Sequence, residues 1–299
     1  RGRPGELNRQ PEAPVAVNDA AELEVVGLTH EGEGVGRVEG YTVFVPGALP
    51  GERVRARVTE TKKRYGQAEL LAVLAPSASR IAPPCPVYSR CGGCQLQHLA
   101  YDAQLVWKRR LVVDALERIG KLKVARGSSP FSQTAGEGDA SGGSLQGDSR
   151  GSVVVHPVIG MEDPWRYRNK AQMPIGFDLA EGGLVGGFYE AGTHRIVDTD
   201  ACLIQHEAIE NAVAAVKRIA RELGIEAYDE RSRTGWLRHV AAKVSFSSGE
   251  LLVVLVGTSR EVERLADFVS RIREALPRAA GILLNVNAER TSEVFGCVM

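Results

Sequence analysis

Several features that would identify a class of protein are scarce or missing in this sequence of 299 residues. The 37 basic side chains are balanced by 37 acidic ones, so the net charge gives no argument for a nucleic-acid partner. No apolar run reaches about 18 residues, so no membrane span and no membrane partner are predicted. The start, Arg1-Gly2-Arg3-Pro4-Gly5, lacks the apolar core of a signal peptide and an initiator Met, which indicates a processed chain or a fragment.

Catalytic signatures are missing as well. A cofactor turn of a Rossmann-like sheet joins a strand to a helix, and no glycine-rich stretch does so here. Gly32-x-Gly34-x-Gly36 lies among short predicted strands, and the glycine pairs at 182–183 and 186–187 surround a hairpin. Cys297 has no charged neighbours that would activate its thiol. We therefore predict no catalytic residue and no cofactor-binding residue within this chain.

The sequence does contain a cluster of thiols. Cys85, Cys91 and Cys94 follow the spacing C-x5-C-x2-C, and Gly92-Gly93 removes side-chain bulk between two of them. Buried or disulfide-bonded cysteines are the alternative, but this spacing is typical of a metal or iron–sulfur site. Clustered, unpaired thiols also favour a reducing, cytoplasmic location.

Such a site usually takes four ligands, and only Cys202 and Cys297 remain in the sequence. Cys202 follows strand-like sequence and precedes a predicted helix. Cys297 lies two residues from the end of the chain, where fraying makes a poor ligand. Cys202 is therefore the favoured fourth ligand, while the spacing alone leaves zinc and iron–sulfur both open.

Two stretches carry a resemblance to a known family. Cys85-x5-Cys91-Gly-Gly-Cys94-Gln-Leu-Gln-His98-Leu, followed by Tyr101, closely resembles the cluster motif of the bacterial 23S rRNA (uracil-5)-methyltransferases. The phrase His194-Arg195-Ile196-Val197-Asp198-x-Asp200-x-Cys202 resembles the one that precedes the distal ligand in that family. The resemblance runs from about residue 21 to residue 296, apart from one insertion. It implies a 4Fe–4S cluster held by Cys85, Cys91, Cys94 and Cys202.

The resemblance also implies an activity and a partner. Enzymes of this family use S-adenosylmethionine to form 5-methyluridine, with the nucleophilic Cys and the cofactor site in a Rossmann-like domain. This sequence resembles the part before that domain, so the S-adenosylmethionine site is expected beyond residue 299. The resemblance implies an RNA-binding and iron–sulfur portion of such an enzyme, with 23S rRNA as partner and no methyl transfer by this chain alone. A stand-alone RNA-binding iron–sulfur module without catalysis and a zinc-binding RNA protein are the alternatives, and no protein partner is inferred.

Residues 21–76 are predicted to form a small all-β barrel of the OB type, because short alternating segments follow one another closely. The stretch Gly40–Glu52 resembles a TRAM domain, an RNA-binding barrel. Residues 53–58 alternate charged and apolar side chains, which predicts a strand with one buried face. The RNA-binding candidates of this barrel are the exposed arginines and the following loop: Arg53, Arg55, Arg57, Lys62, Lys63, Arg64 and Tyr65.

The predicted organisation is multi-domain. The barrel is preceded by a disordered arm (1–20) and followed by an iron–sulfur loop and helix (77–125), a flexible insertion (126–152) and an α+β domain (153–299), since strands and helices interleave there without strict βαβ order. Helices are expected at 101–120, 206–223 and 261–276. A strand at 166–175 is expected to present a basic face toward RNA, made by Arg166, Arg168 and Lys170.

Overall fold

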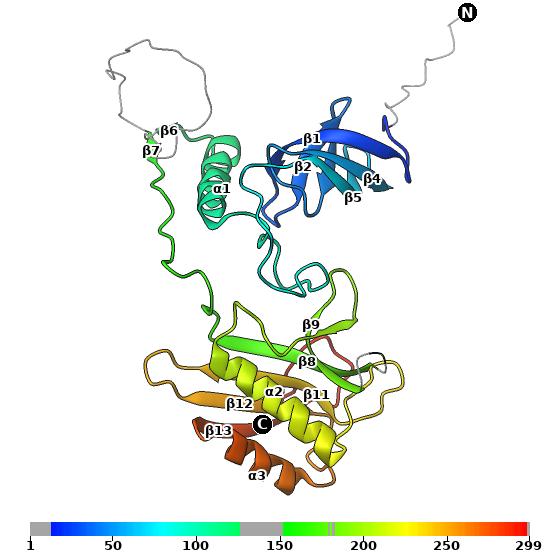
Figure 1. Ribbon diagram of the computed structural model, residues 1–299, viewed down its shortest axis with the longest axis vertical. Coiled ribbons are helices and arrows are strands. Elements are labelled where there is room, and N and C mark those ends of the chain that lie inside the picture. The colour runs from blue at the N-terminus through cyan, green and yellow to red at the C-terminus, as the bar shows by residue number, and fades with distance from the viewer. Residues whose placement is uncertain (1–12, 126–151, 179, 181–182, 298–299) are drawn as a thin grey trace, which may run out of the picture. The chain divides into compact units, whose positions relative to one another are not determined.

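The computed structural model describes residues 13–125, 152–178, 180 and 183–297, which belong to two compact units (Figure 1). The first unit contains residues 1–82 and 95–161, and the second contains residues 83–94 and 162–299. The predicted iron–sulfur segment 77–125 is thus divided, with its cysteines in the second unit and its helix in the first. The predicted arm over residues 1–12 and the predicted insertion over residues 126–151 lie outside the described residues.

The first unit is built on a closed barrel with the strand order β1-β2-β3-β5-β4, which confirms the predicted small all-β barrel. All neighbouring strands are antiparallel except β3 and β5. Alternate side chains of each strand point inward and form an aliphatic core that includes Val43, Val54 and Val58. The strands are β1 (Ala20–Leu28), β2 (Gly34–Val38), β3 (Tyr41–Val45), β4 (Arg53–Thr61) and β5 (Tyr65–Ala75).

Residues 13–19 pack on this barrel, which differs from the predicted disordered arm. Val15 is buried within the barrel core. The amide of Asn18 donates to the carbonyl of Val58 at 2.8 Å, and the amide of Val58 donates to the carbonyl of Asp19 at 2.9 Å. These contacts join residues far apart in the sequence, so composition alone could not show that the segment is ordered.

A buried carboxylate closes one end of the barrel. Glu52 directly precedes β4, its side chain is 0% exposed, and Arg80 donates to it through Nε at 2.5 Å and Nη2 at 2.8 Å. The amides of Leu49 and Ser77 donate to the same carboxylate at 2.8 and 3.2 Å. Burial alone would raise the pKa of Glu52, but these hydrogen bonds outweigh it and lower the pKa below the ordinary value of 4.5.

Glu52→Gln is expected to destabilise the barrel by about 1–3 kcal/mol near neutral pH, because buried donors lose their charged acceptor. A carboxyl group whose folded pKa is lowered stabilises the fold above its unfolded pKa, and loses that effect as pH falls through the folded value. The difference between variant and parent should therefore shrink below pH 4.5. Denaturant unfolding at several pH values measures this. The exposed Glu24→Gln on β1 is the control, and an equal effect of both changes would contradict the prediction.

The predicted helix is present as α1 (Tyr101–Asp114), extended by the π-helical turn η1 (Ala115–Ile119). The helical spacing of Leu105, Val112, Leu116 and Ile119 predicts a buried apolar face, which is wrong, since Val112 and Ile119 are 50% and 83% exposed. The face that packs on the first unit is made by Ala103 and Trp107, which contact a small cluster containing Leu28, Leu49 and Leu99. The helix therefore packs through the large side chain of Trp107, which lies on a different face from the predicted apolar one. A short parallel pair, β6 (Val124–Ala125) and β7 (Val153–Val154), completes this unit.

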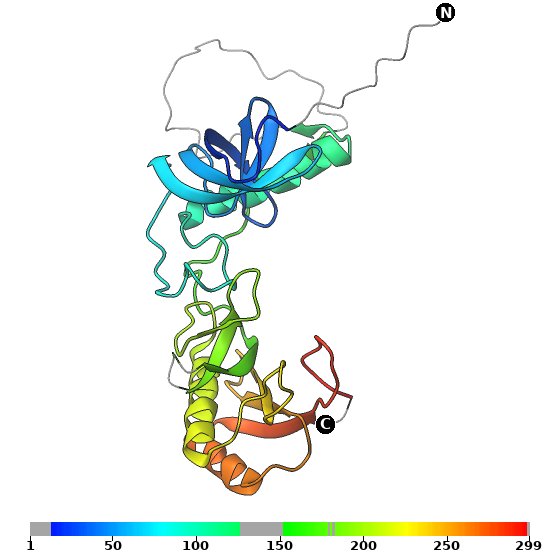
Figure 2. The same cartoon turned by 90° about the vertical axis from the view of Figure 1, so that its right-hand side faces the viewer.

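The second unit is α+β, as predicted, with a six-stranded sheet in the order β10-β9-β8-β11-β12-β13. Only β12 and β13 are parallel, and α3 connects them. Both α2 and α3 cover the same face of the sheet (Figures 1 and 2). The elements are β8 (Lys170–Asp178), β9 (Gly183–Tyr189), β10 (Ile196–Asp198), α2 (Glu207–Leu223), β11 (Leu237–Val244), β12 (Leu251–Gly257), α3 (Leu265–Ala275) and β13 (Ala279–Val286).

Helix α2 organises the core of the second unit. His206 caps its start by accepting from the amide of Ala208 at 3.1 Å, and Gly224 ends it with a left-handed backbone (φ 69°). Its apolar stripe, which includes Ile209 and Val216, is buried against the sheet, as its helical spacing predicted. Within the described residues, no helix combines the length and the apolar character needed to cross a membrane.

Candidate metal centre and nucleic-acid interface

The four predicted cluster cysteines all lie in the second unit. Cys85, Cys91 and Cys94 belong to the loop at 83–94, and Cys202 follows β10. Burial raises the pKa of the Cys202 thiol, and the nearby thiols of Cys94 and Cys91 raise it further. Burial also raises the pKa of Cys91, as does Cys85. These shifts indicate that Cys202 lies near Cys94 and Cys91, and Cys91 near Cys85, so that thiolate charges on them would repel one another.

The glycine pair lets the cysteine loop press against the end of β9. The amide of Gly92 donates to the carbonyl of Tyr189 at 2.9 Å, and Cys91 pairs with Glu190 in an isolated β-bridge. A Cβ added at Gly92 would lie 3.0 Å from that carbonyl oxygen, tighter than ordinary contacts. The amide of Gly93 donates to Sγ of Cys91 at 3.4 Å. The loop thus places one thiol against the sheet and directs a backbone donor at its sulfur.

An ion pair holds Cys202 from the other side. Glu210, on the first turn of α2, accepts from the amide of Cys202 and pairs with Nη1 of Arg166 at 2.5 Å. The same Nη1 donates to the carbonyls of Cys202 and Gln205, both at 3.1 Å. Only 10% of the Glu210 side chain is exposed. Arg166, predicted from the sequence as an RNA contact, is thus bound to the loop that carries Cys202.

No group of three or more His, Cys, Asp or Glu side chains in the described part of the chain is arranged to hold a single metal ion. The four thiols are partly buried, and the Gly93 N–H points at a sulfur, a hydrogen bond of the kind that tunes iron–sulfur clusters. Cys297, by contrast, is exposed. The partial burial of these four thiols is compatible with a shared site, and a four-thiolate cluster with Cys202 as the distal ligand stays a prediction.

The barrel cations are exposed, as predicted, but several are already paired. Arg55 lies 2.9 Å from Glu22, and Arg57 lies 2.9 Å from Glu69. Lys62 pairs with Glu60, and this hydrogen bond raises the pKa of Lys62. Each carboxylate neutralises part of the positive charge that a phosphate would otherwise meet. The remaining barrel candidates are Arg53, which lines a shallow hollow beside β1, and the exposed tip made by Lys63, Arg64 and Tyr65.

The predicted basic strand is shorter than expected. It begins at Lys170 and not at 166, because Arg166 adopts a left-handed backbone (φ 56°) and Arg168 pairs with Gln205 in a separate bridge. Tyr167, Arg168 and Lys170 are exposed and line a hollow of about 500 Å³ whose wall includes Phe188. Among the described residues, no carboxylate forms an ion pair with Arg168 or Lys170. An exposed aromatic with two available cations is a combination that binds single-stranded nucleic acid.

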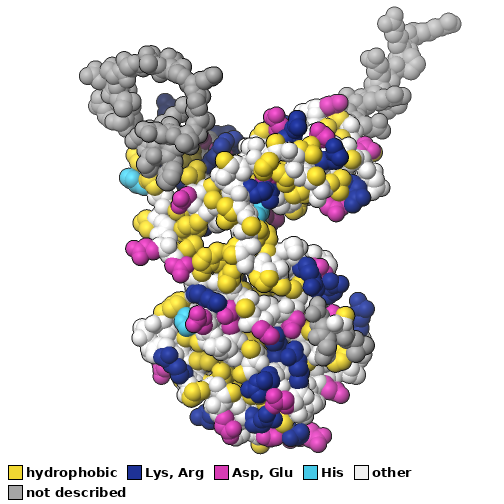
Figure 3. Space-filling view, in the orientation of Figure 1, with side chains coloured by type: hydrophobic (Ala, Val, Ile, Leu, Met, Phe, Trp, Pro, Cys, Tyr) yellow, Lys and Arg dark blue, Asp and Glu magenta, His cyan; other side chains and the backbone are white. Residues whose placement is uncertain are grey.

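The face of the second unit that carries α2 is chemically different. Lys and Arg side chains alternate there with Asp and Glu, so that face shows no patch of a single sign (Figure 3). Arg218 and Arg271, for example, both pair with Glu222. A mixed surface of this kind is a poor binding site for a polyanion.

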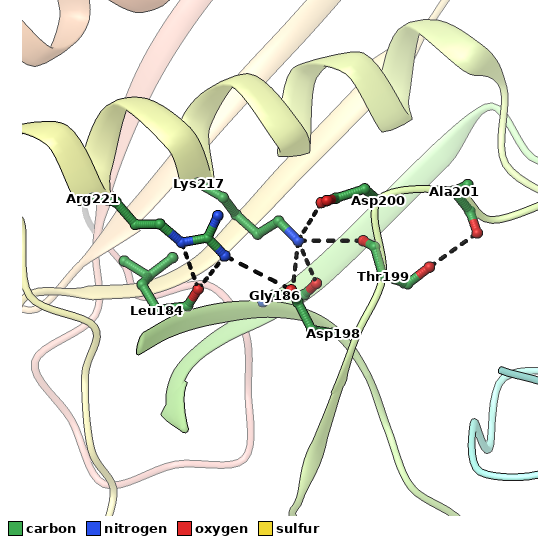
Figure 4. A network of polar contacts seen from close by, with 8 residues as sticks. All are labelled: Leu184, Gly186, Asp198, Thr199, Asp200, Ala201, Lys217 and Arg221. Carbon is green, nitrogen blue, oxygen red and sulfur yellow. Dashed lines mark hydrogen bonds and ion pairs between the residues drawn. The ribbon is translucent and has the colours of Figure 1, made fainter. Parts of the chain in front are cut away.

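Sequence reasoning missed Lys217, which sits in the buried stripe of α2 yet carries a charge. Its side chain is 1% exposed and pairs with Asp198 at 2.7 Å and Asp200 at 2.6 Å (Figure 4). The signal was present in the spacing, since Lys217 follows Val213 by one helical turn and precedes Leu223 on the same apolar side. A Lys on such a stripe needs a buried partner.

Residues 14–71 match the TRAM domain family. This confirms the TRAM domain that was predicted from the barrel sequence. The chain is 45% identical over 285 residues to an uncharacterized RNA methyltransferase of Halalkalibacterium halodurans, covering 95% of this chain and 56% of that protein. It is 38% identical over 279 residues to another, from Listeria innocua, covering 93% and 54%. The chain thus spans about half the length of the curated relatives it matches.

The fold is also similar to a solved structure. The Pyrococcus abyssi tRNA (uracil-54, C5)-methyltransferase, in complex with S-adenosyl-L-homocysteine, matches with a TM-score of 0.58 at 20% identity. The match covers 92% of this chain and 54% of that one. At this identity the similarity shows that the two chains share a fold.

Proposed function

We propose that this chain is the RNA-binding and cluster-bearing part of an S-adenosylmethionine-dependent RNA (uracil-5)-methyltransferase. The observation that carries the proposal is a TRAM domain in the same chain as the C-x5-C-x2-C motif, whose loop is held against the end of β9 by Cys91 and Gly92. Relatives named RNA methyltransferases support it. The fold neighbour, named as a uracil C5 methyltransferase, supports the position of methylation.

The RNA class we propose is 23S rRNA, on the strength of the cysteine motif and the phrase that ends at Cys202. The fold neighbour is named as a tRNA enzyme, so tRNA is the competing substrate. A binding comparison between an rRNA hairpin and a tRNA at equal salt separates the two. Preferential binding of tRNA would overturn the rRNA assignment and leave the uracil-5 reaction standing.

The proposed division of labour follows from the residues present. Carbon 5 of uracil becomes nucleophilic only after a nucleophile adds at carbon 6, and we assign no residue of this chain to that step. The S-adenosylmethionine site is proposed to lie beyond residue 299. The cysteines would hold a 4Fe–4S cluster that joins the loop at 83–94 to the loop after β10. Because C5 methylation transfers no net electrons, the role we propose for these residues is to fix the RNA-facing surface.

We predict that this chain binds RNA without methylating it. The test is incubation with labelled S-adenosylmethionine and an rRNA fragment, followed by nucleoside analysis and a parallel binding measurement. RNA binding without label is the expected result. Label in 5-methyluridine would show an active site within residues 1–299, and failure to bind any RNA with the cluster intact would overturn the proposed function.

We place the strongest RNA contact of the second unit at the hollow lined by Tyr167, Arg168 and Lys170. Arg168 and Lys170 can release counterions from phosphates, because no described carboxylate pairs with them. Tyr167, with 48% of its surface exposed, offers a ring for a base to stack on. On the barrel, Arg53, Lys63, Arg64 and Tyr65 are better candidates than Arg55, Arg57 and Lys62, which already face carboxylates.

Replacing Arg168 and Lys170 together by Gln should weaken RNA binding and flatten its salt dependence. Each lost phosphate contact with single-stranded RNA changes the slope of log affinity against log salt by roughly 0.7, so the pair should change it by about 1.4. Salt titrations on an rRNA hairpin measure the slope. The matched control replaces Arg55 and Arg57 by Gln, where a smaller change is expected. A larger change in the control would move the interface to the barrel strand.

A further inference from the structure

The buried Lys217 binds the segment that leads to Cys202 at several points (Figure 4). Its Nζ lies 2.7 Å from Oδ1 of Asp198 and 2.6 Å from Oδ1 of Asp200. It also donates to the carbonyls of Gly186 and Thr199 at 3.2 and 3.4 Å. Four acceptors thus surround one ammonium group, and two of them are carboxylates; one of these, Asp198, also lies 3.7 Å from Nη2 of Arg221.

The path of the Lys217 side chain depends on a glycine in β9. A Cβ added at Gly186 would lie 2.8 Å from Cδ of Lys217 and 2.6 Å from Cδ1 of Ile175. Real Cβ atoms essentially never approach heavy atoms this closely. Gly186, which the sequence suggested only as part of a hairpin, therefore leaves room for the lysine to cross the strand and reach Asp198.

Three of the four acceptors of Lys217 lie within residues 198–200. Asp198 is the last residue of β10, and Oδ1 of Asp198 also accepts from the amide of Gly186 at 2.8 Å. Asp200 precedes Cys202 by two residues, and the hydroxyl of Thr199 reaches past Asp200 to donate to the carbonyl of Ala201 at 2.9 Å. Both acidic residues that precede Cys202 are thus bound to Lys217.

One helix holds this loop twice. Glu210 accepts from the amide of Cys202, and Lys217 binds the residues before it. The two side chains are seven residues apart on α2, which is two turns and roughly 10 Å along the same face. Helix α2 therefore contacts the segment 198–202 through two side chains, one at each end of the segment.

We propose that Lys217 is a positioning residue that fixes Cys202 for cluster binding, acting through Asp198 and Asp200. This proposal rests on the proposed cluster. Lys217 itself donates only to oxygen atoms in the described contacts, so its effect on the cluster is indirect. Losing a residue that orients a metal ligand typically lowers metal affinity by about 10–100-fold.

The experiment compares three variants of the whole chain. Lys217→Met removes the ammonium, and Asp200→Asn removes one partner whose side chain is 67% exposed, so the second change leaves no buried charge unpaired. Arg218→Met is the matched control. Arg218 is the residue after Lys217 in the same helix, and its replacement breaks only an exposed ion pair with Glu222. The readouts are the rate of iron release to a chelator, the alkylation rate of Cys202 in cluster-free protein, and the midpoint of thermal unfolding.

Iron release is expected to be at least about tenfold faster in Lys217→Met. Asp200→Asn should fall between it and the parent, with an unchanged unfolding midpoint. Alkylation of Cys202 should accelerate in the same order, and Arg218→Met should match the parent in all three readouts. If Lys217→Met fails to fold, Asp200→Asn still decides the question, since its fold does not depend on that charge.

Iron release and Cys202 alkylation at parental rates in Asp200→Asn and in any folded Lys217→Met would overturn the proposal. A parent protein that binds no iron would instead overturn the cluster itself. In that case the alkylation of Cys202 still reports whether Lys217 fixes the loop, so the two failures are distinguishable.

Discussion

Protein purified without oxygen is expected to be brown, to absorb broadly in the visible range and to hold about four iron atoms per chain. Replacing Cys85, Cys91, Cys94 or Cys202 singly by Ser should abolish or greatly reduce the iron content. The reason is that a cubane cluster needs a ligand at each iron corner, and these four cysteines are the ligands that we propose. Iron and zinc analysis with absorption spectroscopy makes the measurement.

Cys297→Ser is the matched control, because Cys297 is exposed and lies outside the four-thiol group. It should leave iron content and colour unchanged. Stoichiometric zinc without iron would contradict the cluster and favour the zinc-binding alternative. Retention of iron in Cys202→Ser together with its loss in Cys297→Ser would contradict the assignment of the distal ligand.

Removal of the iron is also expected to lower the stability of the second unit. The segment 83–94 and Cys202 are far apart in the sequence, so the unfolded chain has no preformed site. The free energy of metal binding therefore stabilises the folded state. The cysteine loop has a few backbone contacts to β9 of its own, such as Gly92 to Tyr189. Chelated protein should therefore lose protection of the loop amides in hydrogen exchange before the sheet core opens.

Arg166→Gln is expected to destabilise the second unit by about 3 kcal/mol. Breaking a buried ion pair leaves the other charge uncompensated, which costs about 3–5 kcal/mol, and the lower end applies because 33% of the Arg166 side chain is exposed. Glu210 would lose its cation, and the carbonyls of Cys202 and Gln205 would lose a donor. Denaturant unfolding of cluster-free protein measures the loss without a contribution from iron.

Arg168→Gln, two residues along, is the matched comparison. Arg168 is exposed and has no carboxylate partner among the described residues, so its replacement should change stability by less than about 0.5 kcal/mol. It should instead flatten the salt dependence of RNA binding by roughly 0.7. A stable Arg166→Gln variant with weakened RNA binding would contradict this separation and restore Arg166 as an RNA contact.

Much of the fold was determined locally by the sequence. The alternation of Arg53 to Val58 fixed which side of β4 faces the barrel core, because successive side chains of a strand point to opposite faces. The helical spacing from Ile209 to Leu223 fixed the buried side of α2 in the same way. The cysteine spacing identified three neighbouring thiols, since residues within one short loop are held close together by the chain itself.

Tertiary structure decided what depends on contacts between distant segments. Periodicity could not show that Arg166 would pair with Glu210, or that Lys217 would find Asp198 and Asp200. Burying these charges is stable only where a partner is supplied, and the partners come from other strands and loops. For the same reason, Arg166 resembles Arg168 in the sequence but differs from it in the structure. The sequence determined the chemical types in the candidate site, whereas the packing of α2 on the sheet decided which of them hold Cys202 and which face solvent.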